Sequence, residues 1–470
     1  KFCRKIFLNA KKLSTLKEEW QGVAEVKQKK YKGLAYAGIQ ILEWLDAIVY
    51  CLFAVFILNI FLFQLYVIPS ESMVPTFLVK DRVFVLKTAA GPHFPLSKVG
   101  LPCINRYKRG DVIVLRNPHY KSNHASEVQK ILSDYISMIT LNHVILDRDE
   151  NGEQKADPLV KRITGQSGEQ LVMLDGNLYA RTKDSETFEK VYDEKAMWNL
   201  NSLSAAEKKK VQLFPLSQED YDVVLELEEE RRNLDLEIAA DECKKLAETF
   251  KSYSNQESGD VSALESIYDS NALFEYNFFR NISDNAILLL KTPAGHQWFT
   301  LFMTDWISKA SESSFAQTDM YADANFRLNV MVKLEAGKMI VRLATLIHNE
   351  VPTVAWSEDK EIQEGLLKIQ KLNAYIGRLD QRNMPVFPKN KEDGSPDYIP
   401  ANCFFMMGDN RYNSLDMRHS YDYKLIPLSS LDKYSVTYYS NMEPQYVSRE
   451  KILGKASFRI WPFTRLGLVK

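Results

Sequence analysis

The chain has 470 residues, of which 45% are hydrophobic and 26% charged, enough for two or three domains with apolar cores. Its net charge of −1 lacks the strong basic excess of a dedicated nucleic-acid binder, so we expect no nucleic-acid partner. Seven scattered histidines form no H-E-x-x-H pattern, and five cysteines form no C-x-x-C pair, which argues against a zinc site.

An apolar run extends from Ala47 to Ile68. It carries no charged side chain, and Asn59 and Gln64 are its strongly polar residues. A helix of about 20 residues crosses a hydrocarbon core, whereas a core helix of a soluble protein shows a polar face. The run therefore predicts a transmembrane helix in a lipid bilayer, which we place at residues 45–68. A cleaved signal peptide is the weaker alternative, because the run is too long and starts too late.

A basic arm precedes this run. Residues 1–42 carry ten Lys or Arg against three acidic residues. Because positive charge favours the cytoplasmic side, we expect a cytoplasmic arm at 1–44 and about 400 residues on the far side of the membrane. The chain begins with Lys1 rather than Met, so we expect N-terminal residues to be missing.

Five later segments read as strands, because they are rich in β-branched and aromatic residues. Within one of them, Asp175-Gly176 is a hairpin signal. The five segments are residues 81–87, 111–115, 159–164, 170–181 and 452–463.

The middle of the chain has a helical pattern. Residues 217–250 contain no Gly or Pro and predict one long helix that Ser217 caps. Residues 358–380 place apolar side chains at helical spacing, and 327–347 fit a strand in one half and a helix in the other. A helix-rich α/β block of some 200 residues thus interrupts a β-rich domain.

Two serines follow the apolar run within the stretch PSESMVPT, residues 69–76. A serine hydroxyl is a poor nucleophile until a base takes its proton, and no histidine is near in sequence. A neutral lysine can act as the base where burial lowers its pKa. Lys161 lies in the apolar stretch LVKRIT, where a strand would place it on one face with Ile163. On these residues alone Lys161 could equally be a solvent-exposed lysine with no catalytic role, since most lysines in strands are solvated.

Five motifs in order resemble the conserved boxes of bacterial type I signal peptidases, the leader peptidases with a Ser/Lys dyad. The first and fourth are highly specific, and the resemblance covers under half the chain. The motifs are PSESMVPT at 69–76, KRGDVIV at 108–114, VKRITGQSG at 160–168, GDNRYNSLDMR at 408–418 and GKA at 454–456.

The resemblance implies a role for each matching residue. Ser72 is similar to the nucleophile and Lys161 to its general base, while the hydroxyl of Ser70 would help to hold the oxyanion. The supporting residues would be Ser414, which would hydrogen-bond the lysine, and two ion pairs, Asp409 with Arg162 and Asp416 with Arg418. The alternative for these four charged residues is that they are ordinary surface charges. The resemblance implies no metal or organic cofactor, and substrates that are preproteins bearing signal peptides with small residues at −1 and −3.

Three departures leave the subsite shape open. Where the family's lysine box continues G-L-P-G-D, this chain has GQSGE at 165–169. Met417 replaces a usual serine, and about 25 extra residues follow Arg418. None of these changes removes a catalytic atom.

The expected fold is a single N-terminal transmembrane helix followed by a β-rich, signal-peptidase-like domain of antiparallel sheets. We expect this domain at 69–182 and 398–470, interrupted by a helix-rich α/β insertion at 183–397. The insertion would be a separately packed unit that docks secretion machinery or shapes the approach of long substrates, or else a stabilising embellishment. The protein would cleave signal peptides at the outer face of the cell membrane, which is the inner or cytoplasmic membrane.

Two rival functions remain. One is a different Ser/Lys hydrolase, such as a self-cleaving repressor-like protease, which the apolar run and the motif at 408–418 oppose. The other is a non-catalytic, membrane-bound binding protein that keeps the motifs for folding alone. The presence of both Ser72 and Lys161 opposes the second rival.

Overall fold

The structure is a computed structural model, and it describes most of the chain. The described residues are 34–94, 97, 99–120, 157–185, 187–214, 216–254, 259–264, 282–310 and 319–469, with a few single positions between 128 and 146. The basic arm predicted at 1–44 lies outside the described residues up to position 33.

A long apolar helix, α2 (Leu34–Phe61), leads into the sheet. Among the described residues, its segment Ala37–Phe61 is the one helix long and apolar enough to cross a membrane, and none of it is buried. The predicted end at residue 68 is wrong, because Phe63–Val67 form strand β1. β1 pairs with β2 (Arg82–Leu86), and an apolar run alone does not distinguish a helix from a strand that gains such a partner.

Antiparallel pairing builds the β-rich part into three sheets. The largest has the order β1-β2-β13-β3-β4-β9-β12, with β14 also paired to β13; a second has the order β7-β6-β5-β8, and the third is the hairpin β10-β11. The remaining strands are β3 (Val112–Leu115), β4 (Leu159–Gly165), β5 (Glu169–Leu174), β6 (Asn177–Thr182), β7 (Glu189–Lys190), β8 (Met384–Phe387), β9 (Cys403–Met407), β10 (His419–Pro427), β11 (Thr437–Met442), β12 (Val447–Ser448), β13 (Ile452–Trp461) and β14 (Gly467–Leu468).

All five predicted strand segments are confirmed in position. At the predicted hairpin, Asp175 and Gly176 both have positive φ, of 50° and 74°, and join β5 to β6. Positive φ at both central residues matches the right-handed twist of the flanking strands.

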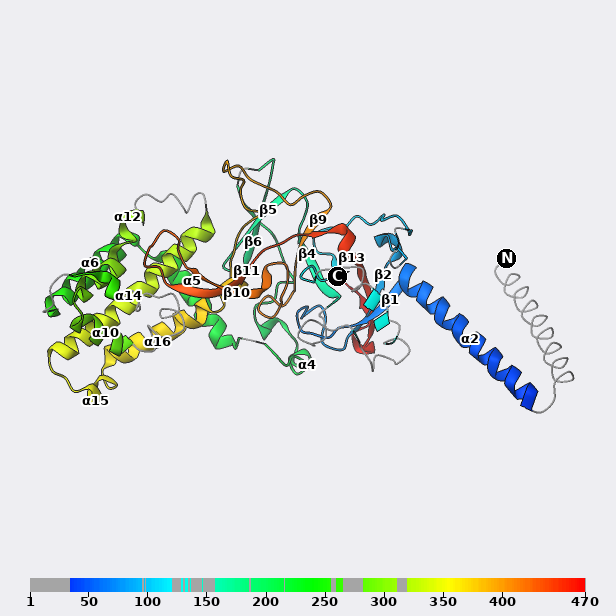
Figure 1. Cartoon of the computed structure of the whole chain (residues 1–470), viewed down its shortest axis with the longest axis horizontal. Helices are drawn as coiled ribbons and strands as arrows, with labels where there is room; N and C mark the ends of the chain where they lie inside the picture. The colour runs from blue at the N-terminus through cyan, green and yellow to red at the C-terminus, as the bar shows by residue number, and fades with distance from the viewer. Residues whose placement is uncertain are drawn as a thin grey trace.

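Most of the helices between β7 and β8 gather at the end of the molecule opposite α2, whereas α4 lies below the sheets (Figure 1). We call α5, α6, α10, α11, α14 and α16 the helical unit. The helices are α4 (Ala205–Lys208), α5 (Gln218–Asn233), α6 (Leu236–Tyr253), α10 (Ile282–Lys291), α11 (Gly295–Thr304), α12 (Ile307–Ala310), α14 (Met320–His348), α15 (Thr353–Trp356), α16 (Lys360–Ile376) and α17 (Leu379–Arg382).

The predicted single helix at 217–250 is instead two helices. Ser217 caps α5 as expected, through a capping box with Asp220. The helix ends at Asn233, and the carboxylate of Asp235 then accepts from the N–H groups of Glu237 and Ile238, which begins α6.

The ambiguous segment 327–347 is helical throughout as part of α14, which packs against α5, α6, α10, α11 and α16. The helical core also takes in side chains after position 397: Tyr412, Leu428, Tyr434, Val436 and Tyr438. The hairpin β10-β11 is therefore packed on the helical unit, although it follows the predicted insertion in sequence.

Candidate active site

The two serines lie on the turn between β1 and β2. The N–H of Ile68 donates to the carbonyl of Asp81 at 2.9 Å, and the N–H of Lys80 returns to Ile68 at 2.8 Å, which closes the loop at its base. Met73 and Phe77 are buried in the sheet core beneath. The Oγ atoms of Ser70 and Ser72 are 3.3 Å apart, with Ser70 exposed and Ser72 half-buried.

Lys161 lies in the middle of β4, between β3 and β9. It is 2% exposed, and Ile163 on the same face is fully buried. Burial lowers the pKa of the Lys161 amine from 10.5 to about 8; the charge of Asp416 opposes this shift and that of Arg418 adds to it. A useful fraction of the amine is therefore neutral near neutral pH and able to accept a proton.

The segment 408–410, which follows β9, joins the serines to the rest of the site. The N–H of Asn410 donates to the Ser72 carbonyl at 3.1 Å. A Cβ on Gly408 would lie 2.5 Å from the Ser72 carbonyl oxygen and 2.1 Å from Ser414 Oγ. Only glycine fits there, because both contacts are far closer than a real Cβ allows.

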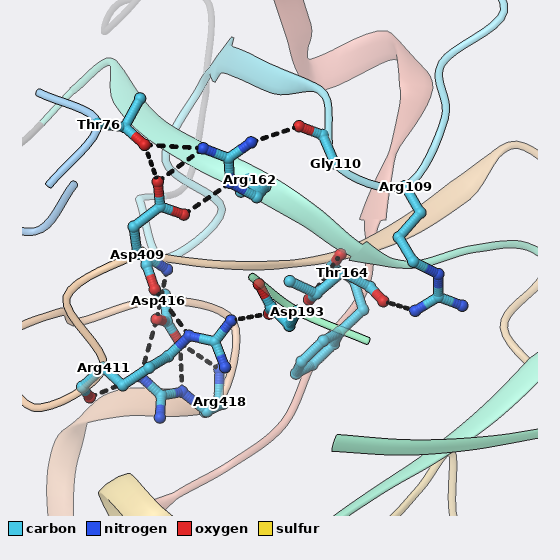
Figure 2. A network of polar contacts seen from close by, with 12 residues as sticks. Thr76, Arg109, Gly110, Arg162, Thr164, Asp193, Asp409, Arg411, Asp416 and Arg418 are labelled. Atoms are coloured by element: carbon cyan, nitrogen blue, oxygen red, sulfur yellow. Dashed lines mark hydrogen bonds and ion pairs between the residues drawn. The ribbon is translucent and has the colours of Figure 1, made fainter. Parts of the chain in front are cut away.

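The first predicted ion pair is present and bidentate. Arg162 Nε and Nη2 each donate to one carboxylate oxygen of Asp409 at 2.7 Å. The hydroxyl of Thr76 donates to the same carboxylate at 2.5 Å, and Arg162 Nη1 donates to the carbonyl of Gly110 at 2.6 Å (Figure 2). This network ties β4 both to the segment after β9 and to the turn that carries the serines.

The second predicted ion pair is also present. Arg418 Nε is 2.8 Å from Asp416 Oδ1, and both side chains are fully buried (Figure 2). Burial alone would raise the pKa of Asp416, but Arg418 outweighs it and holds that pKa well below its usual range. The resulting carboxylate accepts from the Gly408 N–H at 2.8 Å and so fixes the glycine segment.

Ser414 does not make the hydrogen bond to Lys161 that the resemblance implies. Its Oγ is buried and has no partner among the described residues. The Ser414 side chain nevertheless lies against Gly408, where a Cβ on the glycine would meet both Ser414 Oγ and the Ser72 carbonyl oxygen.

Sequence reasoning missed three contributors to this site. Glu71, between the two serines, accepts from backbone N–H groups of Gln212 and Leu213. Asp193 is paired with Arg411, whose Nε donates to the Gly408 carbonyl at 3.0 Å. The contacts of Glu71 and the Asp193–Arg411 pair join segments far apart in sequence, and the pattern of Glu71 or Asp193 alone carries no signal for them.

Within the part of the chain that the structure describes, no cluster of His, Cys, Asp or Glu could hold a metal ion. What the site does present is two hydroxyls on the serine turn and, on β4, a buried amine on which the charges of Asp416, Arg418 and Asp409 act. This is the chemistry of a hydroxyl nucleophile with an amine base.

Comparison with known proteins gives the family. The family model for signal peptidase, peptidase S26, matches residues 41–232 and 347–461, together more than half of the chain. The residues between these ranges include α6, α10, α11, α12 and most of α14.

Curated relatives match over shorter stretches. Signal peptidase I of Buchnera aphidicola subsp. Baizongia pistaciae is 35% identical over 103 residues, 22% of this chain and 33% of the relative. Signal peptidase I P of Bacillus subtilis subsp. natto is 27% identical over 143 residues, 30% of this chain and 52% of the relative. Signal peptidase I of Pseudomonas aeruginosa is 33% identical over 118 residues, 25% of this chain and 40% of the relative.

The aligned segments thus span a third to about half of the lengths of these relatives. The family match includes the turn with both serines, the strand of Lys161 and the segment at 408–418. The chain that carries them belongs to the signal peptidase family, peptidase S26.

Proposed function

We propose that this protein is a membrane-anchored serine endopeptidase that cleaves signal peptides from exported preproteins. The observation that carries the proposal is the buried Lys161, whose pKa falls to about 8. The charges of Asp416, Arg418 and Asp409 act on this amine, and the segment after β9 that carries Asp409 is bonded to the Ser72 carbonyl through the N–H of Asn410. An amine with that pKa can serve as a general base at physiological pH. The relatives named signal peptidase I support the substrate class.

In the proposed reaction, neutral Lys161 takes the proton of Ser72 Oγ as this oxygen attacks the scissile carbonyl. The backbone N–H of Ser72 and the hydroxyl of Ser70 would stabilise the oxyanion that forms. The Lys161 ammonium then gives its proton to the leaving amine, which leaves an acyl ester on Ser72. Water, deprotonated by the same amine, hydrolyses the ester and restores both side chains.

The surrounding residues hold these groups in place. The Arg162–Asp409 pair joins β4 to the segment after β9, and the Asp416–Arg418 pair fixes Gly408 through its N–H. Ser414 lies beside Gly408, close to the Ser72 carbonyl. No step calls on a metal or an organic cofactor.

The proposed location is the inner membrane, with α2 crossing it once and the N-terminus in the cytoplasm. The exposed apolar surface of α2 supports a bilayer-spanning position. The sheet starts at Phe63, directly after α2, so the catalytic residues would lie close to the extracytoplasmic surface. Substrates tethered in the bilayer by their own signal peptides would be cut there, and small residues at −1 and −3 are the expected preference.

The test is cleavage of a model preprotein by the purified protein in detergent. We expect Ser72→Ala and Lys161→Ala to abolish cleavage, and Lys161→Arg to fail as well, because a guanidinium cannot act as a base at ordinary pH. Lys190→Ala, at an exposed lysine on β7, is the matched control and should keep wild-type activity.

Wild-type turnover by either alanine variant would rule out the dyad. Binding of the preprotein without cleavage by the wild-type protein would instead favour the non-catalytic rival.

A further inference from the structure

Glu71 lies between the two site serines, and its carboxylate is buried. The residue is 7% exposed. Oε1 accepts from the backbone N–H of Gln212 at 2.5 Å, and Oε2 accepts from that of Leu213 at 3.0 Å. A buried carboxylate needs such donors, because it has lost its hydration. Both oxygens are therefore held, which fixes the direction of the side chain.

The backbone around Glu71 is held from the other side. Asn410 Nδ2 donates to the Glu71 carbonyl at 3.2 Å, and the Asn410 N–H donates to the Ser72 carbonyl. The N–H of Val74 also returns to the Glu71 carbonyl at 3.1 Å. Restraint of both the main chain and the side chain at Glu71 limits rotation of the turn that aims both hydroxyls.

The donors belong to a short segment, residues 211–214, which we call the strap. Val211 and Phe214 pack on a small apolar cluster that includes Val74 and Leu78 of the serine turn. On its other side the strap is tied to the 408–418 segment, because Asn413 Nδ2 donates to the Leu213 carbonyl at 2.8 Å. The strap thus bridges the two halves of the site.

We infer that Glu71 is a positioning residue for the proposed reaction: its carboxylate, held by the strap, fixes the turn that aims the hydroxyls of Ser70 and Ser72. The inference rests on the proposed function. Glu71 acts through the two serines and exchanges no proton. A misplacement of about 1 Å at a nucleophile can cost about 10²-fold in rate, so such a clamp has a measurable effect.

Glu71→Ala should lower kcat on a model peptide by about 10- to 100-fold and change KM by less than about twofold. The matched control is Glu219→Ala: this carboxylate is exposed on the first turn of α5, shortly after the strap, and its loss should leave kcat unchanged. An unchanged kcat in Glu71→Ala, or an equal fall in Glu219→Ala, would overturn the inference.

A second pair of variants removes one donor of the clamp without touching Glu71. Leu213→Pro deletes the N–H, whereas Leu213→Ala keeps it, and the Leu213 side chain is 74% exposed, so neither loses buried packing. We expect kcat to be lower in the proline variant than in the alanine variant. Combined with Glu71→Ala, Leu213→Pro should add little, because both remove the same bond. Equal kcat in the two variants, or full additivity, would argue against the clamp.

Hydrogen exchange of the whole chain tests the bonds between Glu71 and the strap without an activity assay. The amides of Gln212 and Leu213 should exchange slowly in the wild type and faster in Glu71→Ala, with Glu219→Ala unchanged. Equal exchange in wild type and Glu71→Ala would overturn the inference. A wild-type protein that cuts no preprotein would refute the proposed function, while the exchange result would still decide whether Glu71 holds the turn.

Discussion

Lys161 has charges of both signs around it, and they nearly balance. Arg162 is neutralised by Asp409, and Arg418 by Asp416. Since each pair is internally compensated, neither supplies a net charge that would fix the lysine as an ammonium. Burial then decides the protonation state, which is why the pKa of Lys161 falls to about 8 although two carboxylates lie near.

The rate of cleavage should follow the titration of this amine. Below pH 8 the ammonium form predominates and cannot accept the Ser72 proton, so kcat/KM should fall about tenfold per pH unit on the acid side. Above pH 8 it should level off. The check is a profile of kcat/KM from pH 6 to about 10 in the wild-type protein. Lys161 would not be the base if kcat/KM stayed constant over this range, or if it rose only near pH 10.5, the ordinary pKa of lysine.

Ser70→Ala should lower kcat by about 10²- to 10³-fold, as the loss of one oxyanion donor does elsewhere. Ser70→Thr keeps a hydroxyl and should retain more activity. Ser167→Ala is the control, since its hydroxyl donates to the Cys403 carbonyl instead. The measurement is steady-state cleavage of a peptide, and a change in KM alone would make Ser70 a binding contact.

At the scale of elements, local patterns predict the strands and most of the helices, while non-local pairing decides the errors. β1 was missed because its residues are as apolar as α2, and its partner β2 lies beyond the serine turn. α14 was ambiguous because it is buried on nearly all sides, which removes the polar face that reveals a helix. The motifs predict the site residues themselves, but the strap partners of Glu71 are backbone groups some 141 positions away, which no side-chain pattern reveals.

A buried ion pair joins two elements that are distant in sequence. Lys333 of α14 is paired with Asp432, in the loop between β10 and β11, and both side chains are fully buried. Lys333 Nζ also donates to the Phe302 carbonyl at 2.7 Å, and Asn329 Nδ2 donates to Asp432 at 2.7 Å. The hairpin is thus attached to the helical unit by polar contacts as well as by packing.

Asp432→Ala should lower the free energy of unfolding by about 3 kcal/mol, because it leaves the Lys333 charge buried without a partner. The double variant Lys333→Met/Asp432→Leu removes both charges and should recover most of that loss. Denaturant unfolding of the full-length variants measures both. A double variant as unstable as Asp432→Ala would show that the hairpin depends on the polar contacts themselves.

Across the whole molecule, α2 and the helical unit lie at opposite ends with the sheets between them (Figure 1). If α2 crosses the bilayer, the helical unit projects away from it. Several of its helices fall between the two ranges that the family model matches. The strap and the Asp193 contact, in contrast, precede the helical unit in sequence and contact the site directly.

Replacement of residues 234–346, which carry α6, α10, α11 and most of α14, by a Gly/Ser linker tests whether this part of the helical unit serves recognition. This range spares the strap, β8 and the pairing of Arg382 with Glu228 of α5, so the site keeps its described contacts. We expect cleavage of a short peptide to persist, while cleavage of a full-length preprotein falls by about tenfold, equivalent to about 1.4 kcal/mol of lost binding. Both are measured as kcat/KM with the same cleavage sequence, and circular dichroism checks that the β-sheets remain folded. Equal retention of both activities would make the helical unit a stabilising embellishment. Loss of both in a folded protein would mean that the unit supports the site through the β10-β11 hairpin, whose Val436 and Tyr438 share its core.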